Sequence, residues 1–147
     1  MSIVEPREAA GLARGVCRTL AALGYGTLTE FTLRSGRRAD VIGVNGSGEI
    51  AIVEIKSSEA DFRADQKWPE YLPFCDRFYF AVPEGFPRHI LPESCGLMVA
   101  DAYESAILRP SPAQAPLAGG RRRALILSFA IAASNRLQRA LDPESAL

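Results

Sequence analysis

Two short apolar segments near the middle of the chain each carry one carboxylate, and the second also carries a lysine. Asp40 lies in the segment 38–44, and Glu54 and Lys56 lie in the segment 50–56. An acid within an apolar strand is costly unless it is paired, hydrogen-bonded or bound to a cation. Two acids and one lysine leave a negative charge that a divalent cation would neutralise. We therefore expect a Mg²⁺ or Mn²⁺ site that cleaves phosphodiesters.

The loop between these two segments decides whether the acids can meet. Side chains alternate along a strand, so a slip of one residue would send Asp40 to the wrong face. A two-residue turn would set Asp40 opposite Val53, whereas a three-residue loop over 46–48 sets it opposite Glu54. The longer loop requires a left-handed residue at its third position, which Gly48 supplies. The sequence thus predicts both carboxylates on one sheet face.

Length and composition indicate one domain over residues 1–147. Lys plus Arg and Asp plus Glu both number 17, so the chain does not coat nucleic acid by charge alone. Local arginine clusters at 34–38 and 121–123 still allow a surface that faces a phosphate backbone. Three widely spaced cysteines and one histidine argue against a zinc knuckle and against Ser-His-Asp chemistry.

No apolar run is long enough to span a membrane, and the N-terminus lacks the pattern of a secretory signal. We therefore expect no membrane partner, and a cytoplasmic, nucleoid-associated location.

Periodicity and turn residues predict an α/β fold, a mixed sheet covered by helices on both faces. Pro6 suits the first turn of a helix that ends before Gly24. Pro69 should break a helix that begins near Ser57. The predicted elements are a helix over 6–23, strands over 25–33, 38–44 and 50–56, a helix over 57–67, strands over 77–82, 96–100 and 106–109, a linker at about 110–120 and a helix at about 122–140.

The acidic residues also carry a family resemblance. Asp40 followed by Glu54-Ile55-Lys56 resembles the signature of the PD-(D/E)xK nuclease superfamily, although Ala39 replaces its proline. Longer runs are more specific and resemble the MmcB family of bacterial DNA repair proteins. They are Gly36-Arg37-Arg38-Ala39-Asp40-Val41, Val53-Glu54-Ile55-Lys56-Ser57-Ser58, the segment from Asp61 to Tyr71, the segment from Cys75 to Pro83 and the segment from Gly96 to Tyr103.

The resemblance implies a restriction-endonuclease-like fold and a role in tolerance of DNA crosslinks. It implies that Asp40, Glu54 and the Ile55 carbonyl ligate Mg²⁺ and that Lys56 orients or activates the attacking water. Related nucleases often add an acid from the first helix, which makes Glu8 a further candidate ligand. A first-turn acid that favours the helix dipole is an equal alternative for Glu8.

Several polar residues are candidates for DNA contacts rather than for chemistry. Some relatives carry a Gln-x-x-x-Tyr helix motif, but here Tyr71 comes one place late after Gln66. Trp68 and Tyr71 suit stacking on an exposed base, although packing in the core is the better expectation. The candidate DNA-binding residues are Arg37, Arg38, Arg63, Gln66 and Lys67.

Three functions are consistent with this pattern. The first is a DNA repair endonuclease, with DNA as substrate and a homodimer as one assembly. The second is a DNA-binding module whose catalytic site is inactive. The third is a scaffold that recruits other repair proteins through its apolar last helix.

Overall fold

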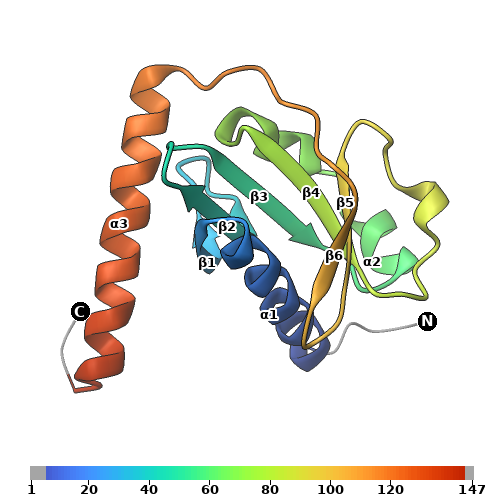
Figure 1. The fold of residues 1–147 in the computed structure, drawn as a ribbon, viewed down its shortest axis with the longest axis horizontal. Helices are drawn as coiled ribbons and strands as arrows, with labels where there is room; N and C mark the ends of the chain where they lie inside the picture. The colour runs from blue at the N-terminus through green and yellow to red at the C-terminus, as the bar shows by residue number, and fades with distance from the viewer. Residues whose placement is uncertain (1–5, 145–147) are drawn as a thin grey trace.

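A six-stranded mixed sheet crosses the centre of the molecule in the computed structural model, which describes residues 6–144 (Figure 1). The strands lie in chain order, so β1 and β6 form the two edges. β1, β2 and β3 are antiparallel neighbours, β3, β4 and β5 are parallel, and β6 is antiparallel to β5. The strands are β1 (Tyr25–Thr32), β2 (Arg38–Asn45), β3 (Ile50–Ile55), β4 (Arg77–Val82), β5 (Gly96–Ala100) and β6 (Ser105–Arg109).

Helices cover both faces of this sheet. α1 (Pro6–Ala22) packs Leu12, Val16 and Leu20 against one face. The other face is covered by the α-helices α2 (Glu59–Ala64) and α3 (Gly119–Leu141) and the 3₁₀ segment η1 (Trp68–Phe74); a second 3₁₀ turn, η2, spans Arg88–Ile90. The predicted α/β class is confirmed, and the arrangement fits a restriction-endonuclease-like core. No helix within residues 6–144 is long and apolar enough to cross a membrane.

The elements follow the sequence signals with small shifts at their ends. α1 begins at Pro6, as predicted, and the chain turns at Gly24 with a φ of +93°. α2 is capped by Ser58, whose Oγ accepts the N–H of Asp61 at 3.1 Å. It ends at Ala64, earlier than expected, and the chain continues from Trp68 as a 3₁₀ helix with Pro69 in its first turn.

The β2–β3 hairpin has the predicted register. Val41 pairs with Val53 and Val44 with Ile50, as a three-residue loop over 46–48 requires. Gly48 adopts a φ of +80° at the left-handed position. The side chain of Asn45 stabilises the loop further, since its Oδ1 accepts the N–H groups of residues 47 and 49. The loop therefore fixes which residue of β3 lies opposite Asp40.

One attachment of the last helix to the sheet is made through Asp76. The carboxylate of Asp76 accepts two hydrogen bonds from Arg122 of α3, at 2.7 and 2.8 Å, and a third from the backbone N–H of Ile50. Leu125 is buried against the sheet, and Phe129 packs on Phe31. α3 begins at Gly119, slightly before the predicted start, because Arg122 and Leu125 belong to its packed face.

The Asp76–Arg122 pair predicts a specific dependence of stability on pH. The hydrogen bonds that Arg122 donates to the Asp76 carboxylate hold the pKa of Asp76 below its ordinary value. Because the folded-state pKa is lowered, the pair stabilises the fold above the unfolded-state pKa and loses that effect as the pH falls below about 4. We expect Asp76→Asn to lower the free energy of unfolding by about 2 kcal/mol at neutral pH.

Urea unfolding of the wild type and of Asp76→Asn at neutral and acidic pH measures this effect. The difference should shrink as the pH drops through the titration of Asp76. Glu84→Gln, which changes an exposed acid, is the control and should match the wild type at every pH. A difference that stays constant with pH would show that the ion pair is not its source.

Candidate functional site

Asp40 and Glu54 lie at the same end of β2 and β3 and hydrogen-bond to each other's strands. The backbone N–H of Asp40 donates to Glu54 Oε1 at 3.1 Å. The backbone N–H of Ile55 donates to Asp40 Oδ2 at 2.8 Å. Each carboxylate therefore has one oxygen held by a backbone amide of the neighbouring strand. The register prediction that brought these two acids together is confirmed by this geometry.

The sheet is irregular at Asp40 on both sides. The backbone pairing of β2 with β3 stops at the pair Val41–Val53. One position further on, backbone N–H groups donate to the side chains of Asp40 and Glu54 instead. On the other side, the β1–β2 ladder skips Glu30, whose φ of +49° is unusual for a residue other than glycine. Such irregularities are common beside active sites, where they redirect a side chain. No turn or glycine signal in the sequence predicts the distortion at Glu30.

Glu54 and Lys56 are both almost fully buried, with 7% and 6% of their surface exposed. Burial, followed by the charge of Asp40, raises the pKa of Glu54 far above its ordinary value. The nearby Lys56 opposes this rise but does not cancel it. The site therefore disfavours a second negative charge beside Asp40, and a bound cation would reverse that preference.

A pocket surrounds these residues between α1 and the start of α2. Asp40, Glu54, Ile55 and Lys56 line it together, and we call it the acid pocket. Exposed arginines from two elements lie along it: Arg14 and Arg18 from α1, and Arg38 from β2. The arrangement combines a buried acid and a half-buried acid with cations at the surface, which suits a substrate that carries phosphates. Its other lining residues include Glu30, Ser57, Asp61 and Asp65.

Ser57 contributes a polar atom that no described residue satisfies. Its Oγ is buried and has no hydrogen-bond partner within residues 6–144. Its backbone N–H donates to Asp61 Oδ2 at 3.1 Å, which fixes the chain directly after Lys56. A buried hydroxyl without a partner is costly, and a ligand in the acid pocket would remove that cost.

The residues of the acid pocket fit a small, hard divalent cation. Within residues 6–144, no three Asp, Glu, His or Cys side chains lie close enough to hold an ion by themselves. Mg²⁺ does not require such a cage, because it usually binds one or two carboxylates and completes its shell with water and substrate phosphates. The two carboxylates of Asp40 and Glu54, each held by a backbone amide, suit that mode.

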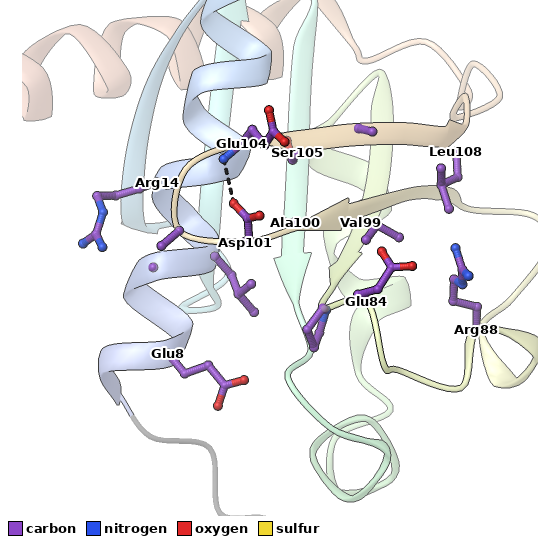
Figure 2. A pocket seen from close by; sticks show the side chains of 15 residues that line it. Glu8, Arg14, Glu84, Arg88, Val99, Ala100, Asp101, Glu104, Ser105 and Leu108 are labelled. Carbon is purple, nitrogen blue, oxygen red and sulfur yellow. Dashed lines mark hydrogen bonds between the residues drawn. The ribbon is translucent and has the colours of Figure 1, made fainter.

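Glu8 does not join the acid pocket. It is exposed on the first turn of α1 and lines a different hollow, together with Glu84 and Asp101 (Figure 2). Ala9, Ala10 and Ala13 are the residues of α1 that line the acid pocket beside its arginines. Glu8 therefore lies on the adjoining side of the helix, in agreement with the alternative that it only favours the helix dipole.

Of the candidate DNA-binding residues, the structure brings only Arg38 to the acid pocket. Arg37 forms an ion pair with Glu70 of η1 at 2.8 Å. Arg63 and Gln66 line another hollow beyond α2, and the amide of Gln66 donates to the carbonyl of Phe62. Lys67 is exposed at the start of η1, outside the residues that line the acid pocket.

The two aromatic residues considered for base stacking belong to the core. Trp68 packs on Phe78 and Phe80, with ring centroids 5.9 and 5.8 Å away. Tyr71 is buried, and its hydroxyl donates to the carbonyl of Arg38 at 2.9 Å. The packing interpretation is therefore correct, and Tyr71 also holds the strand that carries Asp40.

Arg14 and Arg18 of α1 line the acid pocket, although the sequence pattern does not single them out as site residues. Arg14 and Arg18 recur at a spacing of four residues, which places them on one helical face. An exposed face of this kind is usually only solvated, and the sequence does not show that it borders Asp40. The guanidinium of Arg18 also donates to the carbonyl of Tyr103, which positions it beside the β5–β6 turn.

Taken together, the mixed sheet and its paired acids with a buried lysine define a protein of the restriction-endonuclease-like class. A family model described as "DNA repair protein MmcB-like" matches residues 2–144. The chain therefore belongs to the MmcB-like family of DNA repair proteins, as its sequence resemblance suggested.

Two solved structures are similar to the chain. A protein of unknown function from Silicibacter pomeroyi is 44% identical, with a TM-score of 0.89, and the match covers 100% of this chain and 98% of that one. A repair endonuclease from Pyrococcus abyssi is 19% identical, with a TM-score of 0.42, and the match covers 70% of this chain and 49% of that one. No curated protein matches the chain.

Proposed function

We propose that this chain is a metal-dependent deoxyribonuclease that acts in DNA repair. The observation that carries the proposal is the pair of backbone-held carboxylates, Asp40 and Glu54, beside the buried Lys56 in one pocket. A purely structural role explains this grouping poorly, because buried ion pairs are rarely net stabilising. Membership of a DNA repair family supports the choice of DNA as the substrate.

Asp40, Glu54 and the Ile55 carbonyl would hold Mg²⁺ or Mn²⁺ in this proposal. When bound, the ion would neutralise charge on the scissile phosphate and lower the pKa of a water molecule. The backbone amides that bind Asp40 Oδ2 and Glu54 Oε1 orient both carboxylates before any ligand arrives. Such preorganisation reduces the cost of assembling the site when substrate binds.

The remaining residues of the pocket act on the substrate itself. The ammonium of Lys56 donates hydrogen bonds to the attacking water and to the scissile phosphate. Arg14, Arg18 and Arg38 contact neighbouring phosphates and align the strand along the pocket. Because these arginines contact only the backbone, the site itself imposes no base preference through them.

Cleavage of a panel of labelled DNAs with Mg²⁺, Mn²⁺ or Ca²⁺ tests the proposal. The panel contains duplex, single-stranded, flap, junction and crosslinked DNA. We expect cleavage with Mg²⁺ and Mn²⁺, and a loss of at least about a thousandfold in Asp40→Ala with DNA binding retained. Glu84→Ala, which changes an exposed acid outside the acid pocket, is the control and should cut normally.

Two negative results would redirect the proposal. DNA binding without cleavage of any substrate, in the presence of either metal, would favour the inactive DNA-binding module. Absence of DNA binding would favour the scaffold that recruits other repair proteins.

A further inference from the structure

The outward face of α3 carries an apolar stripe that the polar residues Ser134 and Gln138 interrupt. Four large side chains on this face are at least half exposed: Leu127 at 54%, Ile131 at 62%, Leu137 at 60% and Leu141 at 75%. Outside α3, only three large apolar residues within 6–144 are comparably exposed, and they are widely separated in the chain: Leu23, Tyr103 and Leu108. The stripe is therefore a concentrated feature and not the ordinary scatter of surface apolar residues.

The spacing of the stripe is that of a coiled-coil seam. Leu127, Ser134 and Leu141 are seven residues apart, and Ala130 and Leu137 follow the first two of them by three residues. These are the a and d positions of successive heptads. Ala130 and Ser134 are small and exposed, so a second helix can approach closely at the middle of the stripe.

α3 presents this stripe on a rigid support. Its opposite face is tied to the sheet by the Arg122–Asp76 pair at one end. Further along, the guanidinium of Arg136 donates to the carbonyls of Thr29 and Glu30 on the edge strand β1. Figure 1 shows α3 standing at the side of the molecule away from α2, β5 and β6. A fixed helix loses little conformational freedom when a partner docks.

The charges at the two ends of the stripe are complementary to each other. Arg123 is exposed at the N-terminal end and has no ion-pair partner within residues 6–144. Exposed Asp142 and Glu144 follow the C-terminal end. Arg139 lies on the flank toward Glu30, where both line a hollow beside β1. A helix with opposite charges at its two ends complements a copy of itself that runs in the opposite direction.

We propose that two copies of this chain associate through α3, with the two helices antiparallel about a two-fold axis. In this register Leu127 packs against Leu137 of the second copy and Ala130 against its Ser134, while Arg123 reaches its Asp142. A parallel pair would instead set Arg123 against Arg123 and Asp142 against Asp142. The interface lies outside the acid pocket, so both pockets stay open to substrate.

Analytical ultracentrifugation of the full chain over a wide range of concentrations tests the dimer. We expect a dimer for the wild type, and Leu137→Glu should raise the dissociation constant by at least about a hundredfold because it places a charge in the seam. Leu23→Glu is the matched control, because Leu23 lies directly after α1 and is 55% exposed. This variant should stay dimeric. Thermal unfolding should show that every variant is folded.

Charge reversal tests the orientation independently of the apolar contacts. Arg123→Asp and Asp142→Arg should each weaken the dimer by roughly tenfold, and the double variant should restore it. A wild type that remains monomeric, or a dimer that Leu137→Glu leaves unchanged, overturns the proposal. A double variant that does not recover overturns the antiparallel arrangement. None of these outcomes depends on nuclease activity, so the test of the dimer is independent of the proposed function.

Discussion

A Glu54→Gln variant is expected to lose metal-dependent DNA cleavage by at least about a thousandfold and yet to be more stable than the wild type. The loss follows because the amide carries no charge to hold a cation. The gain follows because Glu54 is 7% exposed and burial beside Asp40 raises its pKa. A raised carboxyl pKa means that the fold disfavours the charged form, which the unfolded chain keeps at neutral pH.

The expected gain is at least about 1 kcal/mol in the free energy of unfolding without metal, since each unit of pKa is worth about 1.4 kcal/mol. The glutamine oxygen can still accept the N–H of Asp40, so the local geometry is preserved. Urea unfolding in the presence of a chelator gives the stability, and the cleavage assay gives the activity. Glu104→Gln, an exposed acid, should change neither.

A stability that falls in Glu54→Gln would identify Glu54 as a structural acid. Stability and activity that move in opposite directions are the behaviour of a functional site, where an unfavourable group is retained for its chemistry.

The sequence was sufficient to place the two acids together because the hairpin between them is short and local. One glycine, Gly48, selects a three-residue loop, and the loop length alone sets the register of β2 against β3. The same local signals placed the start of α1 at Pro6 and the start of α2 near Ser57, next to its cap Ser58. Each prediction depended on residues that are neighbours in the chain.

Two candidate residues, Glu8 and Gln66, lie outside the acid pocket for reasons that the local sequence pattern does not contain. Whether Glu8 reaches Asp40 depends on the rotation of α1 over the sheet, which is set by how Leu12 and Val16 pack. Gln66 was expected on a longer helix, but α2 ends at Ala64 and the residue lines a hollow elsewhere. Helical spacing places Arg14 and Arg18 on one face of α1 but does not show that they border the acid pocket.

A Lys56→Met variant is expected to retain metal binding but to cleave DNA about 100- to 10,000-fold more slowly. Lys56 is 6% exposed, so the unbranched methionine side chain can occupy the space of its aliphatic stem. The variant loses the ammonium that would donate to the attacking water and the phosphate. It keeps Asp40 and Glu54, whose carboxylates would hold the ion.

Calorimetric titration with Mn²⁺ and single-turnover cleavage separate these two effects. Removing the positive charge of Lys56 leaves the acids less neutralised, so metal affinity should be unchanged or higher. Lys67→Met is the matched control, because Lys67 is exposed outside the acid pocket and should cleave like the wild type. Wild-type cleavage by Lys56→Met would exclude Lys56 from the chemistry. A loss of metal binding in the same variant would show instead that Lys56 maintains the geometry of the carboxylates.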